Sequence, residues 1–240
     1  MSLGVEKKEA MSGNPAAKTA NRRGRRPSTS ATELEKVAFA LFEQHGFEAT
    51  TVEDIATTAG ITKRTFFRYF ESKNDVVWGS FSDQLRVMRE RFARCPDDQP
   101  IMDAVRTVVV DFNRFDADQV PWHRKRMELI LRVPALQAHS TLRYREWRAF
   151  VAEFVAMRLG LPVGDLIPRS VSYAALGVAI SGYEYWLAEP DADLTQILDC
   201  AFKSLATGFA LPHETNGHRT TIAAPHDERT TRDAAEPKVH

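Results

Sequence analysis

Residues 50–73 read Thr-Thr-Val-Glu-Asp-Ile-Ala-Thr-Thr-Ala-Gly-Ile-Thr-Lys-Arg-Thr-Phe-Phe-Arg-Tyr-Phe-Glu-Ser-Lys, and this stretch predicts two short helices joined at a glycine. Thr51 is a favourable N-cap, and Asp54 three residues later completes a capping-box pattern. Apolar side chains then recur at helical spacing until Gly60, a residue type that commonly ends a helix. Thr62 is the expected N-cap of the second helix, whose first turn is cationic.

A helix, a tight turn with glycine and a short cationic helix form the helix-turn-helix arrangement. Its second helix enters the major groove of DNA and contacts base edges from its N-terminal end. We therefore expect Lys63, Arg64 and Thr65 to contact bases, because lysine and arginine donate to guanine and threonine contacts a base or a thymine methyl group. The alternative is a helical hairpin with a solvated basic face.

A second set of side chains on the same helices is expected to contact phosphates, which set the register on DNA without reading its sequence. Thr51 would both cap its helix and contact a phosphate, since the N-terminus of that helix also directs backbone amides at a phosphate. Arg68 has an alternative, which is to pair with an acidic neighbour. The set comprises Thr51, Thr62, Phe67, Arg68, Tyr69 and Lys73.

These residues resemble the DNA-binding domain of the TetR family of transcriptional regulators. The string TTVEDIATTAGITKRTFFRYFESKNDV has the family's Thr-initiated helix, Ala-Gly-Ile turn, aromatic recognition helix and Ser-Lys exit, and the motif extends from Ser30 to Val77. Phe67 departs from the pattern, because the family often has a tyrosine there whose phenol hydrogen-bonds a phosphate. The segments RYFESKNDVVWGSF, FNRFD, HRKRMELIL and YEYWL further resemble the actinobacterial subgroup associated with the mycofactocin system.

The resemblance implies a dimeric transcriptional repressor that binds a palindromic double-stranded operator and is released by a hydrophobic small-molecule effector. In this family the C-terminal domain binds the effector, and the last two long helices usually form the dimer. The subgroup points to a long-chain acyl-CoA, with Arg124, Lys125 or Arg126 near its phosphates. No cofactor is implied.

The C-terminal part of the chain is rich in aromatic and apolar side chains that are candidates for an effector pocket. Interiors of helical bundles often bind small apolar molecules, although plain core packing explains the same residues and must hold for most of them. The run 123–126 is either a phosphate cradle or, more commonly for such a run, a solvated helix face. The candidate pocket residues are Trp122, Arg124, Met127, Tyr144, Trp147, Tyr183 and Trp186.

Small residues within 168–188 permit close approach of another helix and are the candidate dimer interface, together with apolar positions of the final helix. An intramolecular core explains the same residues. The candidates are Ala174, Ala175, Gly177, Ala179, Ser181, Gly182, Leu198, Phe202, Leu205 and Phe209.

The periodicity predicts an all-α protein with an N-terminal three-helix helix-turn-helix domain at 30–77 and a larger helical domain at 78–211. The resemblance implies that this larger domain is the ligand-binding and dimerisation domain. The β-branched run at 106–110 is assigned to a helix because a lone strand would have no partner. The core of the first domain is expected to contain Phe39, Phe42, Phe47, Phe66 and Phe70. Further helices are expected at 75–94, 101–115, 122–132, 136–159, 168–188 and 194–209.

Charge is balanced over the whole chain but not along it. The 32 basic and 32 acidic residues give a net charge of zero, which argues against a general basic coat for nucleic acid. We expect residues 1–29 to be a disordered basic arm that either enters a minor groove or only raises non-specific affinity, and residues 212–240 to be a disordered tail. The cations of the arm that we expect at DNA are Arg22, Arg23, Arg25 and Arg26.

Enzyme and metal signatures are missing from the sequence: there is no nucleophile elbow, Walker loop, dinucleotide fingerprint or His-Glu-x-x-His motif. Cys95 and Cys200 have no metal-ligand spacing, so we expect no metal site and a reduced, cytoplasmic setting. No stretch approaches the ~18 apolar residues of a membrane span, and the start of the chain lacks the apolar core of a secretory signal. Two rival functions stay open, a ligand-binding enzyme with an accessory DNA-binding domain and an effector-independent DNA-binding protein.

Overall fold

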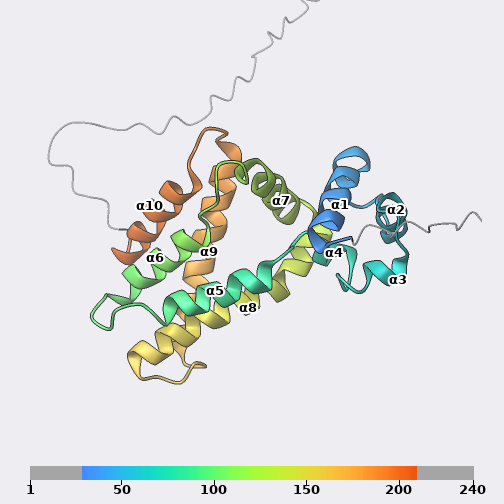
Figure 1. The fold of residues 1–240 in the computed structure, drawn as a ribbon. Helices are drawn as coiled ribbons and strands as arrows, with labels where there is room; N and C mark the ends of the chain where they lie inside the picture. The colour runs from blue at the N-terminus through green and yellow to red at the C-terminus, as the bar shows by residue number, and fades with distance from the viewer. Residues whose placement is uncertain (1–28, 210–240) are drawn as a thin grey trace, which may run out of the picture. The chain divides into compact units, whose positions relative to one another are not determined.

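The computed structural model describes residues 29–209, and its regular elements within that range are helices, as the sequence predicted (Figure 1). The basic arm at 22–26 and the tail at 212–240 lie outside the described residues. None of the described helices is long and apolar enough to cross a membrane. The helices are α1 (Ala31–His45), α2 (Val52–Thr58), α3 (Lys63–Phe66), α4 (Lys73–Val76), α5 (Phe81–Phe92), α6 (Ile101–Phe112), α7 (Val120–Arg132), α8 (Pro134–Leu159), α9 (Leu166–Ala188) and α10 (Leu194–Ala206).

The described chain forms two compact units, and the division falls inside α5 and α8. Unit 1 contains the residues up to Val87 and Phe115–Trp147, which include α1 to α4, α7 and the first part of α8. Unit 2 contains Met88–Arg114 and the residues from Arg148 onward, which include α6, α9 and α10. The helices of the DNA-binding motif therefore pack in one unit with residues 115–147, which the sequence prediction assigned to the second domain.

The first helix begins and ends at signals that its sequence carries. Ser30 is the N-cap, and its side chain and that of Glu33 satisfy each other's backbone amides in a capping box. The helix ends at Gly46, whose φ of 83° is accessible to glycine at little steric cost. Both limits of α1 are thus set by residues at its own ends.

Five phenylalanines form the core beneath α1, α2 and α3, which confirms the predicted set. Each is at most 7% exposed, and burial of a phenylalanine side chain contributes about 1.5–3 kcal/mol. Ring centroids of Phe42 and Phe47 lie 4.9 Å apart, and those of Phe66 and Phe70 lie 5.7 Å apart. The inward position of Phe66 and Phe70 excludes both from stacking on bases.

The helix expected at 75–94 is divided in the structure into α4 and α5. The break contains Gly79, which has a φ of 50°. A Cβ atom there would lie 2.8 Å from Oε2 of Glu35 and 3.1 Å from Nη1 of Arg126, so the backbone passes close to these two side chains. The prediction of a continuous helix was wrong because the reason for the break lies in distant residues.

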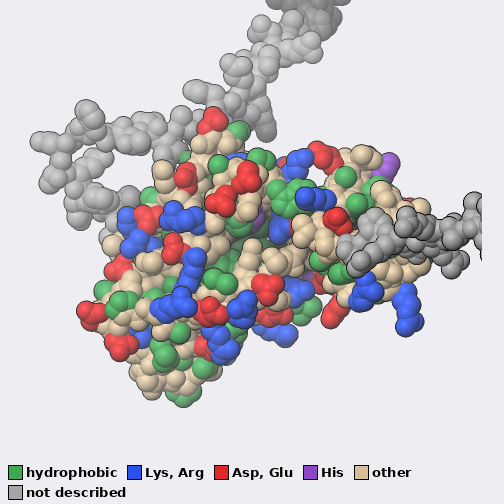
Figure 2. Space-filling model, in the orientation of Figure 1, with side chains coloured by type: hydrophobic (Ala, Val, Ile, Leu, Met, Phe, Trp, Pro, Cys, Tyr) green, Lys and Arg blue, Asp and Glu red, His purple; other side chains and the backbone are tan. Residues whose placement is uncertain are grey.

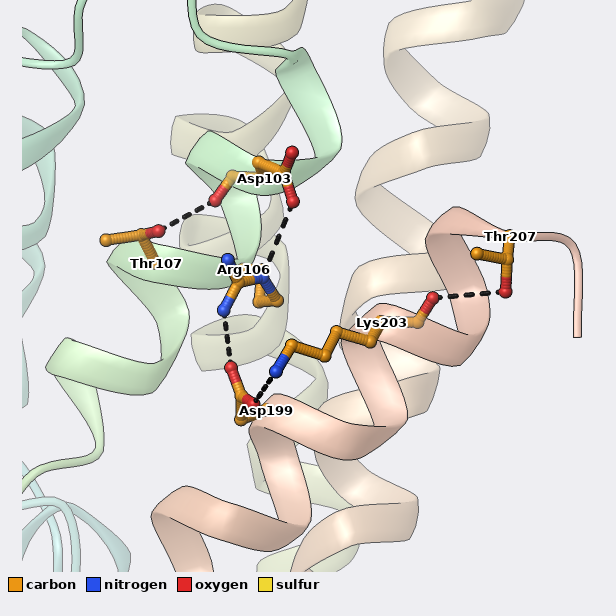
Figure 3. A network of polar contacts seen from close by, with 6 residues as sticks. All are labelled: Asp103, Arg106, Thr107, Asp199, Lys203 and Thr207. Atoms are coloured by element: carbon orange, nitrogen blue, oxygen red, sulfur yellow. Dashed lines mark hydrogen bonds and ion pairs between the residues drawn. The ribbon is translucent and has the colours of Figure 1, made fainter. Parts of the chain in front are cut away.

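In unit 2, a network of charged side chains joins α6 to α10 (Figure 3). Arg106 donates through Nη1 to Oδ1 of Asp199 at 2.5 Å, and Nζ of Lys203 lies 2.7 Å from Oδ2. Asp103 lies 3.6 Å from Nε of Arg106. Hydrogen bonds from Lys203 and then Arg106 lower the pKa of Asp199. The network fixes α10 against α6 at this position.

The small residues of α9 separate into a buried and an exposed set. A Cβ atom on Gly182 would lie 2.7 Å from Cδ2 of Leu198, so this glycine permits the close approach of α10. Leu198 and Phe202 are fully buried within the protomer, and the intramolecular alternative therefore holds for them. Ala175, Ala179 and Gly182 are likewise buried, whereas Ala174, Gly177 and Ser181 are exposed.

Candidate nucleic-acid interface

The N-terminus of α2 is capped as its sequence predicted. The backbone amide and the hydroxyl of Thr51 donate to Oδ2 of Asp54 at 2.8 and 2.7 Å, and the amide of Asp54 donates back to Thr51 Oγ1 at 3.2 Å. The hydrogen bonds from Thr51, first from its side chain and then from its backbone, lower the pKa of Asp54. The box keeps the start of α2 ordered and exposed, where helix amides are available to an anion.

The turn between α2 and α3 is a Schellman motif at Gly60. The amide of Ile61 donates to the carbonyl of Ala56 at 2.9 Å, and the amide of Gly60 donates to the carbonyl of Thr57 at 3.0 Å. Gly60 has a φ of 67°, in the left-handed region. This turn reverses the chain tightly and sets the direction in which α3 leaves the motif.

Helix α3 is shorter than the sequence suggested. Thr62 caps it by accepting from the amide of Thr65 at 3.2 Å, but only Lys63–Phe66 are α-helical. The chain then tightens, because the amides of Arg68 and Tyr69 donate three residues back at 3.3 and 2.9 Å. Such a tightened last turn satisfies helix carbonyls, and it carries Phe67, Arg68 and Tyr69 in place of the regular helix on which we expected them.

The three side chains expected to contact bases differ in the contacts that they already make inside the protein. Lys63 forms an ion pair with Glu53 of α2, in which both side chains are more than half exposed. The hydroxyl of Thr65 lies 3.0 Å from that of Thr62. Arg64 is exposed and has no side-chain hydrogen bond or ion pair to any residue within 29–209. Arg64 is therefore the recognition side chain that can meet a base without first breaking a contact inside the protein.

The end of the arm is attached to the recognition segment. The hydroxyl of Tyr69 donates to the carbonyl of Thr29 at 2.5 Å, and Nη2 of Arg68 donates to that hydroxyl at 3.0 Å. The Arg68 guanidinium also lies 5.0 Å from the Tyr69 ring centroid. The alternative of an acidic partner for Arg68 does not apply within the described residues. Phe67 is 52% exposed and offers an apolar surface beside these groups.

Lys73 has a structural role within the protein that the sequence analysis did not predict. Its ammonium donates to the carbonyls of Phe47 and Thr50 at 2.6 and 2.8 Å, and it lies 4.3 Å from the Phe47 ring centroid. Partial burial lowers the pKa of Lys73. The lysine thus holds the loop between α1 and α2, and its contact with a phosphate stays a prediction.

Together the caps and the turn place the candidate side chains on neighbouring elements of unit 1. Lys and Arg side chains project from the region of α3 in Figure 2. The described candidates on these elements are Thr51, Thr62, Lys63, Arg64, Thr65, Phe67, Arg68, Tyr69 and Lys73. Arg22, Arg23, Arg25 and Arg26 lie outside the described residues.

A buried ion pair joins α1 of the DNA-binding motif to α7. Arg126 pairs with Glu35, and their side chains are only 14% and 12% exposed. Trp122 donates through Nε1 to Oε1 of Glu35 at 3.2 Å, and its ring centroid lies 4.4 Å from that of Phe39. Glu35 therefore receives donors from two successive turns of α7. We call this group of Glu35, Trp122 and Arg126 the α1–α7 node.

A second junction joins α4 to α8. Arg143 donates to Oδ1 of Asp75 at 2.9 Å, and Nε2 of His139 lies 3.3 Å from the same oxygen. The rings of Trp78 and Tyr144 meet edge to face at 5.9 Å. These contacts connect the end of the DNA-binding motif to the first part of α8.

The run 123–126 is not a uniformly solvated face, and that interpretation needs correction. His123 is 9% exposed, stacks on Phe115 at 3.8 Å, and burial lowers its pKa to about 3. Arg126 is buried in the α1–α7 node, while Lys125 is exposed and donates to Glu43 at 2.9 Å. A signal was present in the sequence, since Glu35 lies on the apolar side of α1, between Leu34 and Ala38.

The pocket candidates in unit 1 occupy separate environments. Trp122 belongs to the α1–α7 node, Tyr144 contacts Trp78, and Arg124 is half-buried. Met127 and Trp147 are 8% and 4% exposed. Their assignment to an effector pocket stays a prediction.

The pocket candidates in unit 2 lie close to each other. Ring centroids of Tyr183 and Trp186 lie 6.1 Å apart. The Tyr183 hydroxyl donates to Oδ1 of the buried Asn113, and Nε1 of Trp186 donates to the carbonyl of Ala192 at 3.0 Å. Both aromatic residues thus have their polar atoms satisfied, so that only their apolar surfaces remain for a ligand.

Two grooves on the described residues are small for an effector site. One, of about 210 Å³, lies between α1 and α7 and includes Phe39, Phe42 and Leu129. The other, of about 230 Å³, lies in unit 2 and includes Met102, Val171 and Leu205. Both volumes fall below the roughly 300–1,000 Å³ of typical ligand pockets.

Comparison with known proteins agrees with this geometry. The family model described as bacterial regulatory proteins, tetR family, matches residues 35–77, and the model described as MftR C-terminal domain matches residues 99–210. The chain is 42% identical over 189 residues to the mycofactocin biosynthesis transcriptional regulator MftR of Mycobacterium tuberculosis, covering 79% of this chain and 96% of that protein. The chain therefore belongs to the TetR family of bacterial transcriptional regulators. Within that family, its identity and its C-terminal domain relate it to MftR.

Two further proteins extend the comparison. The chain is 31% identical over 191 residues to the HTH-type transcriptional regulator TcmR of Streptomyces glaucescens, covering 76% of this chain and 83% of that protein. Among solved structures, Thermus thermophilus FadR, a TetR-family repressor in complex with lauroyl-CoA, matches 79% of this chain and 100% of that chain. Its TM-score of 0.52 at 19% identity shows a common fold.

Proposed function

We propose that the protein is a dimeric repressor that reads a palindromic operator through α3 and leaves it when a hydrophobic small molecule binds. The observation that carries this proposal is the capped, exposed recognition segment with Arg64 unpaired among the described residues. An arginine there can donate two parallel hydrogen bonds to O6 and N7 of guanine. A second copy related by a two-fold axis would present the same segment to the next major groove.

The response to an effector requires a physical connection between α3 and the rest of the chain. In unit 1 that connection consists of the α1–α7 node and the contacts of Asp75 with α8. A shift of α7 would have to move α1 or break a buried ion pair, and the second course leaves a charge uncompensated. An effector acts on this equilibrium only through a higher affinity for the state that does not bind DNA.

We infer the dimer from the exposed face of α9. Leu166, Ile167, Tyr173 and Tyr185 are 76%, 52%, 55% and 47% exposed, which is unusual for four large apolar side chains on one helix. An exposed apolar face of this kind marks an interaction surface. The exposed Ala174, Gly177 and Ser181 lie along the same face and would allow a partner helix to approach.

A long-chain acyl-CoA is the effector class that we place first. The structure of T. thermophilus FadR is a complex with lauroyl-CoA, and that ligand supports a choice of chemistry for this chain rather than a binding mode. An acyl thioester combines an apolar chain with phosphates. In unit 2 of this chain, Tyr183 and Trp186 supply apolar surface for the acyl chain.

The proposal is tested by titrating dodecanoyl-CoA against the purified protein bound to its selected operator. We expect thermal stabilisation together with weaker DNA binding, and the reciprocal loss of ligand affinity on the operator. Free CoA and a free fatty acid serve as matched controls for the two halves of the ligand. Stabilisation by all three without release of DNA would contradict the effector mechanism and favour an effector-independent DNA-binding protein. Hydrolysis of the thioester at a steady rate would favour the enzyme alternative.

A further inference from the structure

Two charged side chains stand alone on the exposed face of α9. Arg169 and Glu184 are exposed, and neither has a side-chain hydrogen bond or ion pair to another residue within 29–209. Between them the exposed positions of this helix are Ser170, Tyr173, Ala174, Gly177 and Ser181, which carry no charge. One cation and one anion of α9 therefore limit this stretch of the helix, and Arg148 of α8 adds a cation within it, where its guanidinium lies 4.1 Å from the Tyr173 ring centroid.

The spacing prevents these two residues from pairing within one chain. Positions 169 and 184 are fifteen residues apart, which separates them by about 22 Å along an α-helix axis. Fifteen residues also amount to just over four turns, so both side chains lie on the same flank of the exposed face. The point midway between them falls between Leu176 and Gly177.

We propose that two copies of α9 pack antiparallel about a two-fold axis near Gly177, with Arg169 of each copy paired to the partner's Glu184. This register rests on the dimer proposed above and adds its orientation and the residues that select the partner. A two-fold interface makes each contact twice, so one register gives two ion pairs. Parallel packing in register would instead set Arg169 against the partner's Arg169 and Glu184 against the partner's Glu184.

The remaining residues of the face fit the same register. Reflection through the midpoint places Leu166, which is 76% exposed in the protomer, opposite the partner's half-buried Leu187. Gly177 lies at the crossing point, where nothing lies within 4 Å of the position that a Cβ atom would occupy. The helices can therefore approach closely at the centre, while large apolar side chains pack at both ends.

Charge reversal in the full-length protein tests the register. Arg169→Glu and Glu184→Arg would each replace two attractive pairs by two repulsive ones, and we expect each to raise the dimer Kd by about tenfold or more in sedimentation equilibrium. A mixture of the two variants should form a heterodimer, because each chain then supplies the charge that the other needs. The double variant should form a homodimer for the same reason. Arg94→Glu, an exposed reversal away from α9, is the matched control.

Circular dichroism of every variant checks that the helices remain formed. The register is confirmed if each single variant dimerises weakly while the mixture and the double variant dimerise as the wild type does. No contact within one chain could explain that recovery, because the two positions are about 22 Å apart. If the wild type is dimeric and the single reversals behave like Arg94→Glu, the register is wrong while the dimer stands. If the wild type is monomeric at micromolar concentration, the dimer of the proposed function fails as well. If the single variants dimerise weakly and their mixture does so as well, the proposed pairing of Arg169 with Glu184 is also wrong.

Discussion

Arg64 and Lys73 show how differently two cations of one short motif are used. Arg64 is exposed without a partner among the described residues, whereas the Lys73 ammonium donates to two backbone carbonyls of the loop after α1. The sequence alone assigned both to DNA, because residue type and position in the motif were the only information. Side-chain contacts separate a group available to a ligand from one that is already occupied in the fold.

Arg64→Ala should weaken operator binding by ~1–3 kcal/mol and relax the preference at one base position, if its contact with guanine is bidentate. Fluorescence anisotropy on the operator and on single-base variants measures both effects. Arg68→Ala provides a matched arginine deletion in the same segment, with its guanidinium already at Tyr69. Equal losses on the operator and on random DNA would remove Arg64 from the base-contacting set.

Lys73→Met retains the apolar stem but removes the donors to the carbonyls of Phe47 and Thr50. We expect a loss of about 1–3 kcal/mol in the free energy of unfolding, since both part-buried carbonyls lose a charged donor. Denaturant unfolding measures this loss. The salt dependence of DNA binding decides the predicted phosphate contact separately: a slope lower by about one supports the contact, and an unchanged slope restricts Lys73 to its structural role.

Helix limits were predictable wherever the signals were local. The capping boxes at Ser30 and Thr51 and the turn at Gly60 are formed by neighbours in sequence, and the structure has all three. Tertiary contacts account for what was missed. Gly79 interrupts the helix expected at 75–94 because Glu35 and Arg126 pass beside it, and no local pattern records that approach.

The α1–α7 node gives a prediction at the scale of packed helices. Arg126→Met should cost about 3–5 kcal/mol of unfolding free energy because Glu35 stays buried without its cation. The double variant Glu35→Leu with Arg126→Met should be less destabilised than the sum of the two single variants. Denaturant unfolding of all four proteins measures the coupling, and strictly additive losses would show that the pair does not act as a unit.

The stability of the whole molecule in acid should depend in part on one buried histidine. Burial lowers the pKa of His123 from 6.5 to about 3, so the unfolded chain binds this proton more readily than the folded one. The stabilisation is complete above pH 6.5 and is lost as the pH falls toward 3. The loss per pH unit is about 1.4 kcal/mol at most, because one proton is involved.

His123→Gln should therefore flatten the pH dependence of unfolding between pH 6.5 and 3. Urea unfolding at half-unit pH steps measures the two slopes, and His139→Gln is the matched control for an exchange of histidine elsewhere in unit 1. Identical slopes for the wild type and His123→Gln would show that His123 titrates normally in the folded protein.

The fold and the DNA-binding motif could be predicted for the molecule as a whole because periodicity, caps and motif residues all lie close together in sequence. The residues that line an effector pocket could not be predicted from the sequence. Tyr183 and Trp186 look the same in sequence whether they surround a ligand or each other, and their partners Asn113 and Ala192 are set by the fold. The exposed face of α9 was likewise inseparable from its buried face until α10 was placed against Gly182.

Selection of genomic DNA fragments by the purified full-length protein, followed by footprinting, tests the central claim most directly. A two-fold dimer that reads DNA through α3 should enrich an inverted repeat whose half-sites lie roughly 34–36 Å apart, or a multiple of that, on one face of the duplex. Arg64→Ala should lose preference at the same base position in both half-sites. Enrichment of a single asymmetric half-site at concentrations where the protein is dimeric, or of no sequence at all, would contradict the account.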